Sequence, residues 1–166
     1  MANIPFQVDK MVYDSFPEKQ DIVKKVCDLY QTFIWGGEIE LLNEPQQVMT
    51  YFYCMEEVIW GKGIYEAMRI YPLEWLLGYL NALNTCGNQR EYDHFLEVIQ
   101  LYQRYQSYFF KGEIPPALVA GSSSYDVMMD ENMEDWGMIW LDKLKERNDI
   151  FYEYLRNHKD QLIRYE

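Results

Sequence analysis

The stretch Asn43–Gly63, NEPQQVMTYFYCMEEVIWGKG, decides the fold class predicted for this 166-residue chain. Asn43 is followed three residues later by Gln46, with a proline between them, which is the pattern of a capping box at a helix start. Gly61 and Gly63 are typical of a helix end. The apolar residues between these signals recur at helical spacing; they are Val48, Met49, Phe52, Tyr53, Met55, Ile59 and Trp60. The stretch therefore predicts one long amphipathic helix.

Start and stop signals of the same kind recur on both sides of this stretch. Before it, residues 15–37 begin with Ser-Phe-Pro-Glu and end with Gly-Gly, around an apolar helical pattern. After it, residues 73–87 carry leucines on one stripe and end in Cys-Gly, and residues 88–109 open with the capping box Asn-Gln-Arg-Glu. A final helix is expected from about Asp135 to Asn157.

One long break interrupts this helical pattern. Gly112–Ser124 contains Pro115-Pro116 and the run Gly121-Ser122-Ser123-Ser124. Adjacent prolines do not fit inside a helix, so a loop or an extended crossing is expected here. The predicted fold class is all-α, with residues 1–166 forming a single domain: a bundle of five or six helices with one long Pro/Gly/Ser loop.

Composition predicts a folded cytoplasmic protein. Hydrophobic residues make up 49% of the chain and aromatic residues 17%, which is too apolar for a disordered acidic tail. No run approaches the ~18 consecutive apolar residues of a membrane helix, and the first residues lack the pattern of a secretory signal. Cys27, Cys54 and Cys86 follow no metal-site or disulfide spacing and are expected to be reduced thiols.

The net negative charge comes from two windows of the sequence. Residues 26–61 and residues 112–142 hold 13 carboxylates and no Lys or Arg, while the net charge of the whole chain is −12. A field of this sign repels nucleic acid and anionic membranes and attracts basic proteins. We therefore expect the partner to be a basic protein, either a DNA-binding regulator or a toxin, and neither nucleic acid nor membrane.

The protein-binding residues predicted from these windows are all carboxylates; they are Glu38, Glu40, Glu44, Glu56, Glu57, Asp126, Asp130, Glu131, Glu134 and Asp135. If residues 126–135 are helical, several of them form like-charge pairs four residues apart, each of which destabilises a helix by ~0.2–0.5 kcal/mol. Replacing Asp130 and Glu134 by amides is then expected to raise stability at low salt.

The sequence offers little for catalysis or cofactor binding. Glu91-x-x-His94 has the spacing of one half of a di-iron site, but the only other histidine, His158, has no glutamate three residues before it. No nucleophile elbow and no phosphate-binding glycine loop is present. We expect no metal, no cofactor and no enzymatic activity. An unrecognised enzyme, with a pocket that collects Glu57, His94 or Tyr102, is the minority alternative.

The segment Glu57–Tyr65, EVIWGKGIY, resembles the Glu-Val-x-Asn-Gly-Gly-Phe element of a bacterial family of unknown function that includes a DNA-mimic protein. It departs from that element at Trp60, Lys62 and Ile64. A leucine-rich helix, a further helix, and Leu141-Asp142 with Phe151-Tyr152 follow in the family's order, so that the resemblance covers residues 43–165.

The resemblance implies an all-helical acidic protein, often a homodimer, that occupies the DNA-binding surface of a regulator or another basic protein. An immunity protein that neutralises a cognate toxin is the alternative, since acidic patches suit both tasks.

Overall fold

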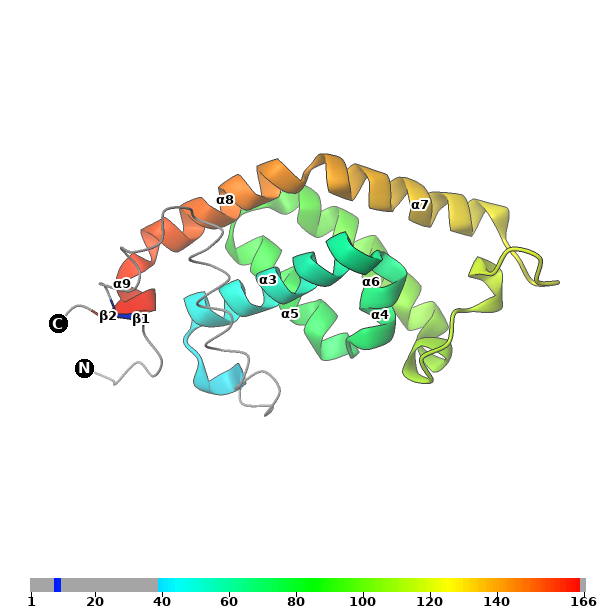
Figure 1. Ribbon diagram of the computed structural model, residues 1–166, viewed down its shortest axis with the longest axis horizontal. Helices are drawn as coiled ribbons and strands as arrows, with labels where there is room; N and C mark the ends of the chain where they lie inside the picture. Colours follow the sequence, from blue (N-terminus) through cyan, green and yellow to red (C-terminus); the bar gives the residue numbers. More distant parts are fainter. Residues whose placement is uncertain (1–7, 10–38, 165–166) are drawn as a thin grey trace.

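The structure, a computed structural model, describes residues 8–9 and 39–164, which are helical apart from one short strand pair and the connecting turns (Figure 1). The strands β1 (Val8–Asp9) and β2 (Ile163–Arg164) pair in parallel. The helical elements in chain order are η1 (Ile39–Leu41), α3 (Glu44–Lys62), α4 (Ile64–Ile70), α5 (Leu73–Thr85), α6 (Gln89–Phe110), η2 (Pro116–Leu118), α7 (Val127–Asp142), α8 (Leu144–Asn157) and α9 (Lys159–Leu162).

Helix α3 begins and ends as its sequence predicts. The Asn43 side chain accepts a hydrogen bond from the Gln46 backbone at 3.0 Å, and the Gln46 side chain accepts one from the Asn43 backbone at 3.0 Å. Both halves of the capping box are therefore present. Gly63 ends the helix with φ +83°, a conformation that glycine adopts without a steric penalty. Its amide donates to the Ile59 carbonyl, and α4 begins directly after it.

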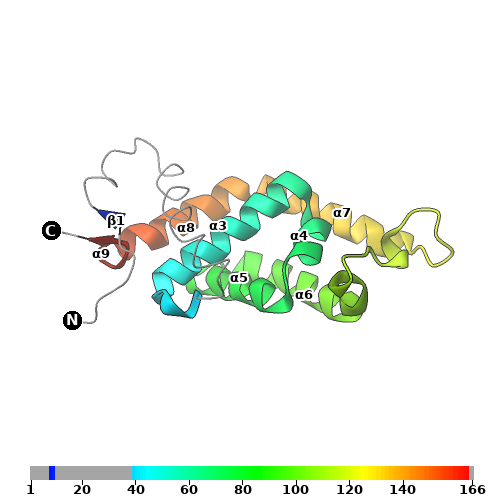
Figure 2. The same cartoon turned by 60° about the horizontal axis from the view of Figure 1, so that its bottom comes forward.

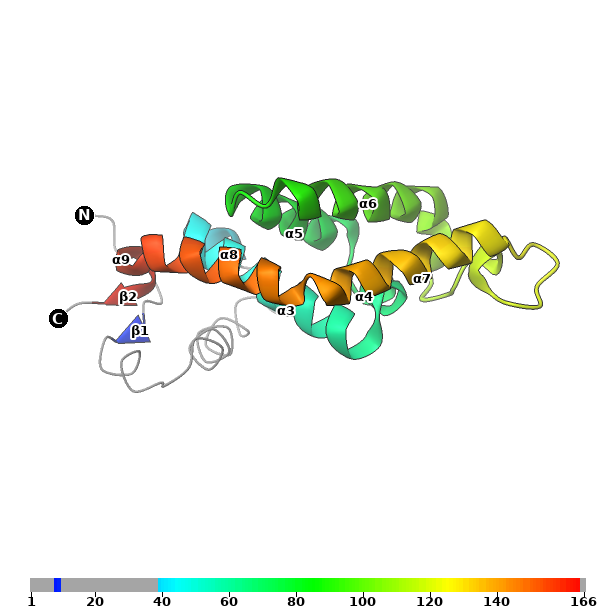
Figure 3. The same ribbon diagram turned by 90° about the horizontal axis from the view of Figure 1, so that it is seen from above.

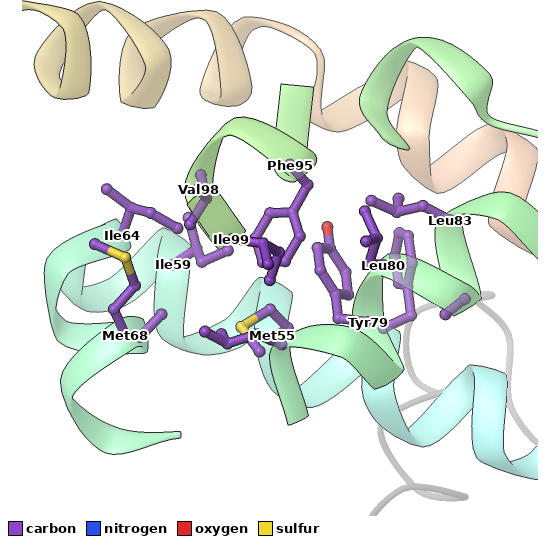
Figure 4. Packing of buried hydrophobic residues seen from close by; sticks show 14 of the residues in the cluster. Met55, Ile59, Ile64, Met68, Tyr79, Leu80, Leu83, Phe95, Val98 and Ile99 are labelled. Atoms are coloured by element: carbon purple, nitrogen blue, oxygen red, sulfur yellow. The ribbon is translucent and has the colours of Figure 1, made fainter. Parts of the chain in front are cut away.

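The hydrophobic core lies where α3, α4, α5 and α6 meet. Met55 of α3, Tyr79 of α5 and Phe95 of α6 are fully buried and lie close together (Figure 4). The rings of Tyr79 and Phe95 meet edge to face, with centroids 4.7 Å apart. Figure 2 shows α3 and α4 on one side of α5 and α6, so that the core fills the space between two helical layers.

Helices α7 and α8 follow each other along the length of the molecule. Seen from above in Figure 3, they run over the seam between α6 on one side and α3 with α4 on the other. Trp140 of α7 and Phe151 of α8 are the buried anchors of this pair, and Phe151 stacks on Phe52 of α3 at a centroid distance of 4.0 Å. Trp140 therefore packs the last turns of α7 against Tyr79 and Phe95 of the core, and one side of α7 faces outward (Figure 1).

The prediction of one final helix from Asp135 was wrong in two respects. The helix begins at Val127, because the side chain of Asp126 caps it by accepting from the Met129 backbone at 3.2 Å. It also breaks at Lys143, which leaves helical geometry at φ −98°, ψ 4°. Short-range periodicity continues through this break, which is why the sequence pattern did not reveal it.

The number of helices also differs from the prediction of five or six. Within residues 39–164 there are seven α-helices, since α4 is separate and the last predicted helix is split and followed by α9. The helix predicted over residues 15–37 lies outside the described residues. The all-α class itself is confirmed for the part of the chain that the structure describes.

Candidate functional site

A buried charge cluster fastens the break between α7 and α8 to the rest of the molecule. Arg147, in the first turn of α8, is 1% exposed. Its Nε and Nη2 atoms donate to the two carboxylate oxygens of Glu56 on α3, at 2.7 and 3.0 Å. This two-point geometry matches the planar guanidinium to the planar carboxylate, which is the strongest form of such a pair.

The remaining edges of the guanidinium are also in contact with protein. Its Nη1 atom donates to the Trp140 carbonyl at the end of α7 and lies 3.5 Å from Glu91 of α6. The guanidinium carbon lies 3.6 Å from the centroid of the Trp140 ring, a cation–π geometry. One side chain therefore ties α8 to α3, α6 and α7.

Burial sets the protonation of this cluster. Burial raises the pKa of Tyr79 well above its usual value, and the Glu56 carboxylate adds to the effect, so the phenol keeps its proton and donates to Glu56 at 2.8 Å. Burial also raises the pKa of Glu91, partly offset by Arg147 and His94. The cluster is closed to solvent and acts as a clamp that positions α7.

Glu56 is therefore not part of an acidic surface, although the sequence placed it in one. It is 8% exposed, and its charge is matched by Arg147. Helical register explains the error: Glu56 and Glu57 are adjacent, so their directions differ by ~100° and only one of them faces solvent.

The other predicted carboxylates of the first window do not share one face. Glu44 and Glu57 are both exposed on α3, but they are 13 residues apart, which places them ~140° apart around the helix. Their neighbours differ accordingly. Burial and Glu44 raise the pKa of Tyr154 to about 12, whereas burial and Glu57 raise the pKa of Cys54 to about 12. Glu40 is exposed in η1, and Glu38 lies outside the described residues.

The second window ends in α7, and two of its predicted carboxylates have structural partners at the start of that helix. Asp126 is the N-cap. Asp130 is half-buried and accepts from Tyr65 of α4 at 3.1 Å and from Tyr125 at 2.8 Å. Asp130 thus links the start of α7 to α4, so that its charge is supported by two phenol donors and by the N-terminus of the helix.

The residues of α7 that the structure describes as exposed form what we call the outer face of α7; they are Val127, Met128, Glu131, Met138, Ile139, Leu141 and Asp142. Met128 is 72% exposed and Met138 is 58% exposed, values that are high for such apolar side chains. The side chains of Glu134 and Asp135 lie outside the described part of the structure.

The described residues give no support to a metal site. Among the side chains that the structure describes, no group of three or more from His, Cys, Asp or Glu could hold a metal ion. In the Glu91-x-x-His94 motif, Glu91 is 2% exposed and turned toward Arg147. The Asn88 side chain still caps α6 by accepting from the Glu91 backbone at 3.3 Å, but the Glu91 carboxylate is committed to the ion pair and does not complete the predicted box.

The cysteines of the described residues are poor nucleophiles. Burial raises the pKa of both Cys54 and Cys86 to about 12, so that both thiols keep their protons at neutral pH. Neither is in a disulfide. The third cysteine, Cys27, lies outside the described residues.

Sequence reasoning missed Arg147, the residue on which the clamp depends. A signal for it was present: Arg147, Phe151 and Tyr154 fall on one helical stripe, and all three are buried. An arginine on an apolar stripe indicates a buried partner, but the stripe does not say which of the 27 acidic residues that partner is.

Comparison with known proteins identifies no relative of this chain. No protein-family model, no curated protein and no solved structure matches this chain. The resemblance drawn from Glu57–Tyr65 therefore stays a prediction. Among the described helices, none has the length and apolar character needed to cross a membrane.

Proposed function

We propose that this chain is a non-enzymatic binding protein whose outer face of α7 engages a basic surface on another protein. One observation carries the proposal: α7 contains acidic residues and no Lys, Arg or His, and it exposes large apolar side chains beside them. Apolar side chains give such a contact buried area, while the carboxylates select a basic partner and speed its approach.

The attachment of α7 supports this proposal. Asp130 anchors its first turn to Tyr65 and Tyr125, and Trp140 with Arg147 anchors its last turn. A helix held at both ends loses little further freedom when a partner binds, which leaves more of the interaction energy for affinity. The first charge window supports it less, because its exposed carboxylates point to different sides of α3.

The partner is proposed to be a DNA-binding regulator, whose DNA site the acidic helix would occupy as a DNA mimic does. The alternative partner is a toxin with a basic cleft, which this chain would neutralise as an immunity protein. Competition separates the two: a DNA duplex displaces this chain from a regulator, whereas a toxin loses its activity on binding. A homodimer that presents two such helices is compatible with either partner.

The test is a pull-down from the source cell at about 50 mM and about 500 mM NaCl, followed by affinity measurements with the purified partner. Glu131→Gln with Asp142→Asn removes two charges from the outer face of α7. Asp93→Asn with Glu97→Gln removes two exposed charges from α6 and is the matched control. We expect the first pair to weaken binding roughly tenfold at low salt and the control to change it little. Equal effects, or recovery of no basic protein at low salt, would contradict the proposal.

A further inference from the structure

Helix α3 carries an exposed tryptophan beside an exposed glutamate. Trp60 is 68% exposed, which is high for a side chain that is mostly buried in folded proteins. Glu57 is also exposed, and it precedes Trp60 by three residues on the same helix, so that their Cβ atoms lie ~5–6 Å apart. We call these two residues the Glu57–Trp60 pair. One ligand can contact both of its side chains.

Neither side chain of the pair is engaged within the described part of the chain. Among the described side chains, Trp60 makes no ring contact and Glu57 makes no ion pair. Lys62 follows Trp60 by two positions and is therefore ~200° away around the helix. Arg69 of α4 is paired with Glu66 at 2.7 Å. The pair is therefore available to a cation of another molecule.

The buried clamp shows how this protein holds a cation with the same two groups. There the guanidinium of Arg147 lies over the ring of Trp140, 3.6 Å from its centroid, and its edge meets the carboxylate of Glu56. The indole attracts the cation through its ring face, and the carboxylate accepts charge-assisted hydrogen bonds from it. The Glu57–Trp60 pair offers an indole and a carboxylate of the same kind at the surface.

Helical register places Trp60 close to the side of α3 that faces the break between α7 and α8. It follows Glu56, which binds Arg147, by four residues, an offset of ~40° around the helix and ~6 Å along it. Figure 3 shows α7 passing over the end of α3 and over α4, and Tyr65 of α4 donates to Asp130 of α7 at 3.1 Å. A partner that covers the outer face of α7 is therefore within reach of the pair.

The chemistry of the pair favours arginine over lysine. A guanidinium is planar, so it can stack on the indole of Trp60 and still direct N–H groups in its own plane toward Glu57. The ammonium of lysine is compact and strongly hydrated, so it gains less from the ring. A second copy of this chain has the same net charge of −12, so the two copies repel each other.

On the basis of the proposed function, we infer that the Glu57–Trp60 pair binds an arginine side chain of the partner protein. The guanidinium stacks on Trp60, and its N–H groups donate to Glu57. This inference goes beyond the binding of a basic surface by α7, because it adds a site on α3 and names the residue type that the partner presents there.

The test uses a labelled hexa-arginine peptide and a hexa-lysine peptide of the same charge, with affinity measured by fluorescence anisotropy at about 50 mM NaCl. The variants are Trp60→Ala, Glu57→Gln and the two combined. Glu97→Gln removes an exposed charge from α6 and is the matched control. The indole N–H signals in the NMR spectrum show which tryptophan each peptide contacts, and Trp60→Phe assigns the signal of Trp60. Circular dichroism confirms the helical content of each variant.

We expect hexa-arginine to bind roughly fivefold more tightly than hexa-lysine and to shift the indole signal of Trp60. Trp60→Ala should remove this preference, and Glu57→Gln should weaken the binding of hexa-arginine more than Glu97→Gln does. Because both side chains of the pair hold one guanidinium, the double variant should lose less affinity than the product of the two single losses.

Equal losses in Glu57→Gln and Glu97→Gln, or an arginine preference that survives Trp60→Ala, would overturn the inference. If Glu131→Gln with Asp142→Asn weakens the binding of both peptides while the variants of the pair do not, the inference fails and the proposed function stands. Binding of neither peptide would contradict both. Light scattering completes the test: a dimer that Trp60→Ala dissociates would mean that a second copy covers Trp60, which also overturns the inference.

Discussion

The guanidinium of Arg147 forms a two-point ion pair with Glu56, 91 residues earlier in the chain, with N–O distances of 2.7 and 3.0 Å. Both side chains are buried, and the pair lies where α8 begins. The same guanidinium covers Trp140, the last buried residue of α7. The position of the outer face of α7 therefore depends on the buried ion pair between Arg147 and Glu56, in which none of the residues of that face takes part.

Replacing Arg147 by methionine is expected to destabilise the protein strongly. The change leaves Glu56 and Glu91 buried near each other without a cation, a loss of about 3–5 kcal/mol in the free energy of unfolding. Urea unfolding followed by circular dichroism measures it. The matched control is Arg156→Met, which breaks an exposed pair with Glu153 and is expected to cost less than about 1 kcal/mol. Equal losses in the two variants would show that the clamp does not stabilise the fold.

Replacing Glu91 by glutamine is expected to remove a pH-dependent part of the stability. Burial, partly offset by Arg147, raises the pKa of Glu91 in the folded state above its ordinary value of 4.5. The folded state therefore holds this proton more tightly than the unfolded state does. The stability that Glu91 contributes is complete below pH 4.5 and is lost as the pH rises through the raised value.

The measurement for Glu91 is the free energy of unfolding of the wild type and of Glu91→Gln between about pH 4.5 and pH 7.5. The stability of the wild type relative to the variant should fall as the pH rises. A difference that is flat or that grows with pH would mean that Arg147 outweighs burial at this site.

Replacing Asp130 by alanine is expected to lower stability. Like-charge repulsion alone would predict a gain in stability instead. The variant removes the two hydrogen bonds that Asp130 accepts from Tyr65 and Tyr125, at a cost of about 1–3 kcal/mol. Glu131→Ala, one residue later and exposed, is the control and should change stability by no more than about 0.5 kcal/mol. Hydrogen exchange at the start of α7 should rise in the first variant and not in the second. A gain in stability for Asp130→Ala would mean that like-charge repulsion along α7 outweighs these two hydrogen bonds.

Replacing Gly78 by alanine is expected to be destabilising although Gly78 lies inside helix α5. A Cβ atom at this position would lie 2.5 Å from Cζ and 2.6 Å from Cδ1 of Tyr51, whose ring packs edge to face against Trp75. The overpacking is expected to cost about 1–3 kcal/mol. The matched control is Gly137→Ala in α7, where the added Cβ meets nothing within 4 Å, and which should stabilise the helix by about 0.5–1 kcal/mol. Thermal unfolding of the two variants should therefore shift in opposite directions.

The helix starts show how far local sequence carries a prediction. The capping box at Asn43, the stop at Gly63 and the cap at Asn88 are made by residues within four positions of one another. Contacts of this range leave a recognisable spacing in the sequence, so α3, α5 and α6 could be placed without a structure. The break at Lys143 could not, because no glycine or proline marks it.

The candidate site was predictable only in part, for the same reason. The absence of basic residues from 112–142 is a property of the sequence, and it marked the segment that contains α7, although not where that helix begins. Whether a carboxylate is buried or exposed depends on its neighbours in space. Glu56 meets Arg147, and Asp130 meets Tyr65, 65 residues earlier in the chain. Composition counts these carboxylates as equal, whereas burial removes Glu56 from the surface and leaves Glu131 on it.

The sequence by itself thus determined the all-helical class, the starts of α3 and α6, and the confinement of the net negative charge to two windows. These follow from interactions along one helix turn or from composition alone. The tertiary structure decided the break between α7 and α8, the clamp at Arg147 and the mixed character of the outer face of α7. Each of these depends on which segments, 65 to 91 residues apart, pack together, and the free energy that selects that packing is spread over the whole core.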